Sequence, residues 1–155
     1  MRKLFRSSNI VVALGASILL AACSASGTIS GSYGGSGDES SVKELVRNVG
    51  DRVFFKTDSA ALSAEARSTI MRQADWLNTN SKTLTIEGHA DERGTREYNI
   101  ALGARRANAV KDYMISLGVD GSRLDTVSWG KERHVSLCAE DACWSKNRRS
   151  VSVIQ

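Results

Sequence analysis

The chain has 155 residues, of which 41% are hydrophobic and 25% charged, and this length allows one small domain around a single core. Its net charge of +4 comes from 21 basic and 17 acidic residues, but Arg2, Lys3 and Arg6 precede the first acidic residue, so the remainder carries 18 minus 17, or +1. A balance so close to neutral gives no support to nucleic-acid binding, and we expect no nucleic-acid partner.

The first 22 residues are typical of a secretory signal peptide. The basic segment is followed by an apolar run over 10–22, which is too short to cross a bilayer comfortably as a mature helix. LAAC, residues 20–23, resembles the lipobox of bacterial lipoproteins, in which the cysteine is lipidated and becomes the mature N-terminus. We therefore expect a lipid on Cys23, and Ser24 in place of an inner-membrane-retaining aspartate implies an anchor in the outer membrane, facing the periplasm. The alternative is an ordinary signal peptide with an incidental cysteine.

A Gly/Ser-rich segment separates this leader from the domain. Residues 24–41, SASGTISGSYGGSGDESS, are nearly free of large apolar side chains. Such a composition predicts a flexible tether, so we expect a lipidated N-terminus and tether over 23–41 and one domain over 42–155. The sequence contains neither a second candidate for a transmembrane segment nor an internal repeat.

The domain begins with a strand, a helix and a second strand. DRVFF, residues 51–55, has the aromatic and β-branched residues of a short strand. A helix is predicted from Ser63, a good N-cap, to about residue 79, because apolar residues recur there at helical spacing. That stripe consists of Ala66, Ile70, Ala74 and Leu77. After a polar break, TLTIEGHA over 83–90 alternates as a strand, with Leu84 and Ile86 on one face.

A second helix and two more strands complete the chain. The helix is predicted over 97–117, with Gly118 suited to its C-terminal cap. Its apolar stripe is Leu102, Val110, Met114 and Leu117. SRLDTVSWG, residues 122–130, reads as a strand with Val127 and Trp129 on one face; a loop, with a helical turn allowed, follows. RRSVSVIQ, residues 148–155, is predicted as a final strand with Val151 and Val153 facing inward.

This order, β-α-β-α-β-(α)-β, predicts an α/β (α+β) fold built as a two-layer sandwich. Helical connections favour parallel pairs among the early strands, and the shorter link to the last strand allows it to run antiparallel. We expect a mixed, mostly parallel four-stranded sheet with its helices on one face.

Two cysteines, Cys138 and Cys143, lie close together in CAEDAC. An exported chain meets oxidants, so a disulfide closing this loop is favoured. The spacing does not match a CxxC redox motif. Two free thiols and a weak metal site are the alternatives.

Three charged residues stand where a ligand site is expected. Asp58 and Asp91 each follow a predicted strand, and ligands in open α/β sheets favour strand ends where the chain turns towards a helix. Arg106 shares the helix face of Leu102 and Val110, so it must either reach the edge of the protein or bind an anion. A guanidinium near carboxylates suits a zwitterion, since arginine grips a carboxylate through two parallel hydrogen bonds and an aspartate takes the ammonium. The alternative is an internal Asp–Arg salt bridge.

The run GHADERGTREYNIALGARRANAV, residues 88–110, resembles the OmpA-like peptidoglycan-binding domain family. The family's helix pattern Asn-x2-Leu-(Ser/Gly)-x2-Arg-Ala-x2-Val is matched by Asn99, Leu102, Gly103, Arg106, Ala107 and Val110. VFFKTDSAAL, SWGKER and WSKNRRSV are also similar to family segments. The resemblance covers about residues 50–155 and the lipobox, and it is closest to the lipid-anchored members.

The resemblance implies a ligand, the meso-diaminopimelate of the peptidoglycan stem peptide, whose free side-chain end carries an ammonium and a carboxylate. By position, Asp91 would take the ammonium and Arg106 the carboxylate. The other roles implied by position are a lining carboxylate at Asp58, a charged contact at Arg93, packing at Leu102, backbone contact at Thr57, loop support at Asn99, and structural or rim roles at Arg148 and Arg149.

The resemblance further implies a noncatalytic protein that needs no metal and no cofactor. Its implied partners are peptidoglycan, TolB and other Tol proteins, and, through the lipid, the outer membrane. Its implied role is to link that membrane to the cell wall during envelope maintenance and cell division.

Three departures from the family pattern affect loops. Arg96 and His134 stand where many relatives have proline, and CAEDAC replaces a loop that usually lacks cysteines. The chain contains no proline at all, so we expect these loops to be less rigid than in relatives.

Other functions were weighed against this one. Glu87, His89, Asp91 and Glu92 are close in sequence, as in some metallohydrolases, but they form no HExxH or comparable ligand set, and no GxSxG motif occurs. A lipoprotein that mainly recruits proteins remains an alternative. A stator or porin-linked OmpA-like domain is disfavoured by the short lipidated leader and the lack of a barrel or transmembrane helix.

Overall fold

The computed structural model describes residues 38–155, so the predicted signal peptide, Cys23 and most of the predicted tether lie outside the described residues. Helix α1 covers Glu39–Glu44 and continues as a π-helical turn over Leu45–Val49. The tether was expected to extend to residue 41, but the side chain of Asp38 caps the helix by accepting from the Ser40 amide at 3.2 Å. Leu45 from the following turn belongs to the core, so α1 leads directly into the packed part of the domain.

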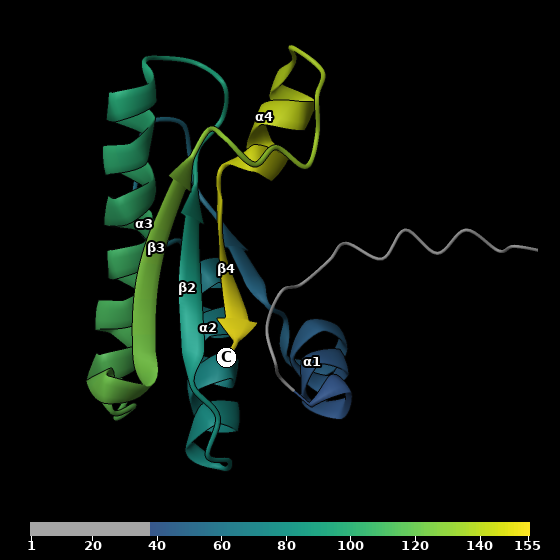
Figure 1. The fold of residues 1–155 in the computed structure, drawn as a ribbon, viewed down its shortest axis with the longest axis vertical. Coiled ribbons are helices and arrows are strands. Elements are labelled where there is room, and N and C mark those ends of the chain that lie inside the picture. The colour runs from purple at the N-terminus through teal and green to yellow at the C-terminus, as the bar shows by residue number, and fades with distance from the viewer. Residues whose placement is uncertain (1–37) are drawn as a thin grey trace, which may run out of the picture. The chain divides into compact units, whose positions relative to one another are not determined.

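Four strands form one sheet in the order β1-β4-β2-β3 (Figure 1). Their bounds are β1 Arg52–Phe54, β2 Leu84–His89, β3 Leu124–Gly130 and β4 Arg149–Ile154. β2 and β3 are parallel, whereas β4 is antiparallel to both β1 and β2. The mixed sheet and the antiparallel last strand are therefore confirmed. The expectation of mostly parallel pairing is wrong, because β4 inserts between β1 and β2 and leaves one parallel pair.

Two long helices, α2 (Ala64–Asn78) and α3 (Arg96–Ser116), pack on one face of the sheet and share a single core with it. Both begin at capped residues: the side chains of Ser63 and Thr95 accept hydrogen bonds from the Ala66 and Tyr98 amides. The predicted stripes are confirmed, with Ile70, Leu77, Val110 and Met114 at most 1% exposed. They meet Leu84, Ile86, Leu124 and Ile154 of the sheet.

The inward face of β4 differs from the prediction. Ile154 lies opposite Leu84 and Ser152 opposite Ile86, so these two residues share the helix-covered face. Val151 and Val153 therefore point to the other face, opposite Glu87 and Thr85. A serine is tolerated inside because the Ser152 hydroxyl donates to Gln73 Oε1 of α2 at 2.9 Å.

A short helix, α4 (Asp141–Asn147), lies beyond the carboxyl ends of β2 and β3 (Figure 1). A 3-10 turn over Gly121–Arg123 precedes β3. Across residues 38–155, none of the helices has both the length and the apolar character needed to span a membrane.

Candidate functional site

A cavity of about 220 Å³ opens where β1 and β2 end and α3 begins. Its lining residues are Thr57, Asp58, Asp91, Arg93, Gly94, Tyr98, Asn99, Leu102 and Arg106. The structure thus brings together, around one cavity, every residue predicted for the ligand site and the expected supporting residue Asn99. Tyr98 and Gly94 were missed, although Tyr98 precedes Leu102 by one helical turn and so shares its face.

Arg106 is the most deeply buried residue of this cavity, with 0% of its surface exposed. Its guanidinium donates to three backbone carbonyls: Nε to Ser59 at 2.9 Å, Nη1 to His89 at 2.7 Å and Nη2 to Lys56 at 3.1 Å. These bonds tie α3 to the segments that follow β1 and β2. They also explain why an arginine interrupts an apolar stripe, since a buried cation needs acceptors.

No carboxylate within residues 38–155 forms an ion pair with Arg106. Burial lowers the pKa of Arg106 to about 10, against the attraction of the more distant Asp91 and Asp58, so the side chain stays charged at neutral pH. An internal Asp91–Arg106 salt bridge, the alternative raised by the sequence, is therefore not formed. The cavity wall instead carries a buried cation whose neighbours are carbonyl dipoles.

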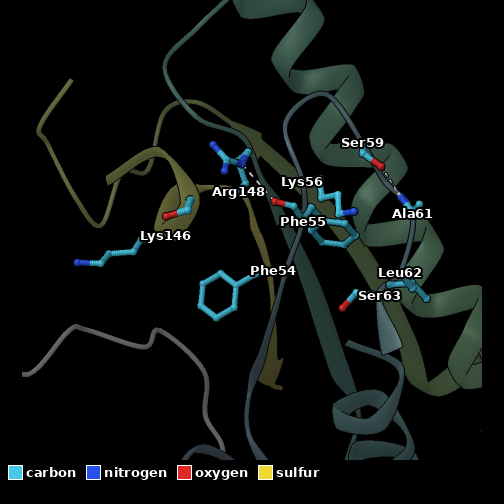
Figure 2. Close-up of a pocket in the computed structure, with 10 residues that line it drawn as sticks. Phe54, Phe55, Lys56, Ser59, Ala61, Leu62, Ser63, Lys146 and Arg148 are labelled. Carbon is cyan, nitrogen blue, oxygen red and sulfur yellow. Dashed lines mark hydrogen bonds between the residues drawn. The ribbon is translucent and has the colours of Figure 1, made fainter. Parts of the chain in front are cut away.

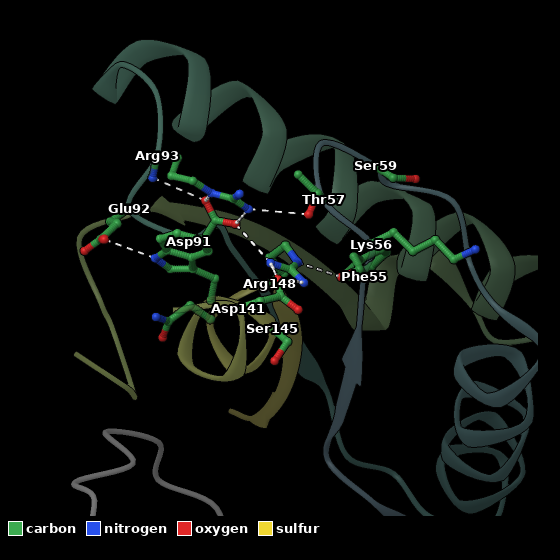
Figure 3. A network of polar contacts seen from close by, with 12 residues as sticks. Phe55, Lys56, Thr57, Ser59, Asp91, Glu92, Arg93, Asp141, Ser145 and Arg148 are labelled. Atoms are coloured by element: carbon green, nitrogen blue, oxygen red, sulfur yellow. Dashed lines mark hydrogen bonds and ion pairs between the residues drawn. The ribbon is translucent and has the colours of Figure 1, made fainter. Parts of the chain in front are cut away.

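Asp91 lies on the same cavity and is held by two other arginines (Figure 3). Its Oδ1 accepts from the amide and Nε of Arg93, both at 3.2 Å. Its Oδ2 accepts from Arg93 Nη2 at 2.6 Å and from Arg148 Nη1 at 3.3 Å. Burial alone would raise the pKa of Asp91, but these hydrogen bonds lower it below its ordinary value, so the carboxylate is ionised.

Arg148 is only 6% exposed and joins three parts of the structure. It donates to the Phe55 carbonyl at 3.1 Å and pairs with Asp141 of α4 at 3.2 Å, in addition to Asp91. The family resemblance gave this residue only a structural or rim role. The contacts show that Arg148 binds the Asp91 carboxylate and also connects α4 to the end of β1.

The rim is formed by Thr57, Asp58 and Tyr98. The Tyr98 hydroxyl donates to the Asp58 carboxylate, which raises the pKa of Tyr98. Asp58 has a positive φ of 51°, a left-handed conformation that aspartate adopts more easily than most residues. The Thr57 hydroxyl accepts a long bond of 3.4 Å from Arg93 Nη2, so the loop after β1 meets the loop after β2.

The loop after β2 is held by side chains of α3 and of the residue that follows β3. Asn99 Nδ2 donates to the Arg93 carbonyl at 2.8 Å, and Lys131 Nζ donates to the Gly94 carbonyl at 2.7 Å. Gly94 has a φ of 90°, which favours glycine at this turn. Asp91 and Arg93 are therefore presented by a loop with fixed backbone geometry.

A close backbone contact sets the separation of the two charged groups. Gly88 of β2 packs tightly on Gly103 of α3. A Cβ added to either glycine would overlap the backbone of the other. Gly88 is three residues before Asp91, and Gly103 is three residues before Arg106. The acid and the guanidinium are thus positioned by the place where the two backbones touch.

A larger cavity, about 570 Å³, lies along the loop between Phe54 and Ser63 (Figure 2). Phe54, Phe55, Ala61 and Leu62 supply apolar surface, and its charged lining residues are Lys56, Lys146 and Arg148. This lining includes no carboxylate. Of these two cavities, the smaller is the better candidate site, because it has carboxylates as well as guanidinium groups in its lining.

The carboxylates and histidine near Asp91 do not gather as a metal site. No group of three or more His, Cys, Asp and Glu side chains placed to hold a metal occurs in the described part of the chain. Neither Glu87 nor His89 lines the cavity. His89 is 1% exposed, with its Nε2 at 3.6 Å from Glu87 Oε2.

Protonation of His89 is expected to weaken the fold. Burial lowers the pKa of His89 below its ordinary value of 6.5, so the unfolded chain takes up the proton first and the free energy of unfolding falls as pH drops through 6.5. The loss between pH 7.5 and 5.5 is expected to be at most about 1.4 kcal/mol. Urea unfolding of the native chain and of His89→Gln should show this loss only in the native chain; equal pH dependence would contradict the assignment.

Comparisons with known proteins agree with this fold. The OmpA family model matches residues 54–148. The chain is similar to the peptidoglycan-associated lipoprotein of Mesorhizobium japonicum, with 45% identity over 152 residues that cover 94% of this chain and 90% of that protein. The corresponding lipoprotein of Agrobacterium fabrum is 46% identical over 162 residues, covering 99% and 91%.

Solved structures are similar as well. The crystal structure of the peptidoglycan-associated lipoprotein from Burkholderia pseudomallei matches with a TM-score of 0.66 and 38% identity, covering 68% of this chain and 90% of that chain. The C-terminal domain of Helicobacter pylori MotB shares the fold, with a TM-score of 0.63 and 21% identity, over 68% of this chain and 84% of that one. The chain therefore belongs to the OmpA family and, within it, to the peptidoglycan-associated lipoproteins.

Proposed function

We propose that this protein binds peptidoglycan noncovalently by gripping the free side-chain end of meso-diaminopimelate in the stem peptide. The observation that carries the proposal is the buried guanidinium of Arg106, which lines a cavity, stays charged and has no carboxylate partner within residues 38–155. A ligand carboxylate would supply the missing negative charge. The names of two similar relatives, with identities of 45% and 46%, point to the same polymer.

Arg106 has donors left for such a carboxylate. A guanidinium carries five N–H groups, and three of those on Arg106 are used by the carbonyls of Lys56, Ser59 and His89. One N–H on each of Nη1 and Nη2 is left over. These two are suited to the two oxygens of one carboxylate, the arrangement in which arginine binds anions most strongly.

Asp91 is placed to receive the ligand ammonium. Its contacts with Arg148 and with the amide and Nε of Arg93 are 3.2–3.3 Å long, whereas the contact with Arg93 Nη2 is 2.6 Å. An ammonium would displace one of the longer contacts and leave the short one. Leu102 and Tyr98 would cover the methylene groups between the two charges.

The site does not require catalysis, a metal or a cofactor, and we propose a mechanical role. Lipid on Cys23 would hold the protein in the outer membrane, on the periplasmic side, while the domain holds the cell wall. As part of a Tol–Pal system, with TolB and other Tol proteins as partners, it would support envelope integrity and cell division.

The test is a pull-down of the purified chain with isolated sacculi. Free meso-diaminopimelate is expected to release the protein, whereas Nα-acetyl-L-lysine amide, which has a side-chain ammonium but no carboxylate, is expected to release far less. Asp91→Asn keeps the shape but removes the charge and should reduce binding at least about tenfold. Asp112→Asn, an exposed carboxylate elsewhere on α3, is the matched control and should bind normally.

Unchanged binding by Asp91→Asn, or equal release by both competitors, would rule out the proposed binding of the ligand by Asp91 and Arg106. Binding of TolB without any binding to sacculi would instead show a protein-recruiting module. Far-UV circular dichroism of both variants checks that each remains folded.

A further inference from the structure

Helix α4 is too short to be stable by itself. It has seven residues, and its N-cap residue Glu140 makes no side-chain capping bond. Isolated helices of this length do not persist in water, so α4 must be held by contacts with the rest of the domain.

The loop before α4 provides two such attachments. Cys138 is bonded to Cys143, the third residue of the helix, as a disulfide. At the other end of α4, Asn147 Oδ1 accepts from the Val135 amide at 2.9 Å, and its Nδ2 donates to the Ser136 carbonyl at 2.8 Å. The loop is therefore fastened to both ends of the helix, covalently at the first turn.

The loop that carries Asp91 and Arg93 contacts α4 and the residue that follows it (Figure 3). Trp144 Nε1 donates to Glu92 Oε1 at 3.0 Å, and the guanidinium carbon of Arg93 lies 4.2 Å from the centre of the Trp144 ring. Arg148, just beyond the end of α4, binds Asp91. The helix thus touches Glu92, Arg93 and, through Arg148, Asp91.

We propose that α4 is a positioning element for the ligand site, and that its contacts with the loop carrying Asp91 and Arg93 depend on the Cys138–Cys143 disulfide. Binding to the wall is then redox-sensitive. This inference rests on the proposed function. Trp144 is a positioning residue: its ring holds Arg93 in the orientation that directs the guanidinium at Asp91. Preorganised charges bind a ligand more tightly than mobile ones, because less ordering is needed on binding.

The chemistry requires an external dithiol or other thiol reductant. Such a reductant gives two electrons and two protons to the disulfide, leaves Cys138 and Cys143 as thiols and is itself oxidised to a disulfide. Cys138 is exposed, so one of the two sulfur-bearing residues is accessible from solvent. Reduction is expected to leave the sheet and the main core cluster in place, since neither cysteine belongs to that cluster.

The experiment compares sacculus binding by the full chain before and after treatment with dithiothreitol. The oxidised chain is expected to bind, and reduction should weaken binding about tenfold. The double variant Cys138→Ser/Cys143→Ser should bind as weakly as the reduced chain and should not respond to dithiothreitol. Because it keeps Cys23, it also controls for effects of the reductant at that position.

Two variants of Trp144 separate positioning from folding in the oxidised state. Trp144→Ala removes both contacts and is expected to weaken binding about fivefold, while Trp144→Phe keeps a ring for Arg93 and should recover part of the loss. Thermal unfolding is measured for each protein in parallel. Equal binding by the oxidised and reduced chains, or full binding by Trp144→Ala, would overturn the inference and leave the proposed function standing. Failure of the oxidised native chain to bind would overturn both.

Discussion

Replacing Arg106 with alanine is expected to lower the free energy of unfolding by about 3–5 kcal/mol and to abolish binding to sacculi. The side chain is fully buried, and its loss leaves a cavity and removes the donors for the carbonyls of Lys56, Ser59 and His89. Each carbonyl left without a partner costs about 1–3 kcal/mol unless water reaches it. Chemical unfolding and sacculus pull-down measure the two effects separately.

A conservative variant separates stability from recognition. Arg106→Lys keeps the positive charge, but its single ammonium cannot serve three carbonyls and also grip a carboxylate with two parallel bonds. We expect a stability loss of about 1–2 kcal/mol and binding weakened at least about tenfold. Full binding by Arg106→Lys would show that the guanidinium is not the site that binds the carboxylate. A fully stable Arg106→Ala would show that the hydrogen bonds to the three carbonyls contribute little to the free energy of unfolding.

Gly88→Ala is expected to destabilise the domain by about 3 kcal/mol or more, near or beyond the usual range for overpacked cores. A methyl group at this position would overlap the Gly103 carbonyl, and backbone cannot move aside as a flexible side chain can. The reciprocal change, Gly103→Ala, meets Ser128 Oγ and, at 2.8 Å, the Gly88 carbonyl. Both changes force β2 and α3 apart, and both should therefore weaken sacculus binding by separating Asp91 from Arg106.

Gly121→Ala is the matched control for this prediction. A Cβ there would lie 3.3 Å from the end of the Ile115 side chain, which can shift. Its unfolding midpoint in urea is expected to remain near that of the native chain, whereas those of Gly88→Ala and Gly103→Ala fall. If all three variants were equally stable, the contact between Gly88 and Gly103 would not be too close for a methyl group.

Local sequence determined most of the secondary structure. Ser63 and the stripe that contains Ile70 and Leu77 placed α2 to within a residue, because capping and 3.6-residue periodicity act over one or two turns. Asp58 and Asp91 were expected near the ligand because each follows a strand. The roles of Arg93, Leu102 and Thr57 came from the family resemblance, and their placement around one cavity is a result of the structure.

Tertiary structure alone decided the features that join distant segments. Arg106 bonds carbonyls 47 and 50 residues away, and Arg148 reaches Asp91 across 57 residues. The insertion of β4 between β1 and β2, and the inward position of Ser152, likewise depend on strand neighbours that the local pattern does not specify. Periodicity shows which side of an element is apolar, because that is a property of the element itself. Which partners meet that side is settled only when the whole chain packs, since the acceptors for a buried charge come from elsewhere in the sequence.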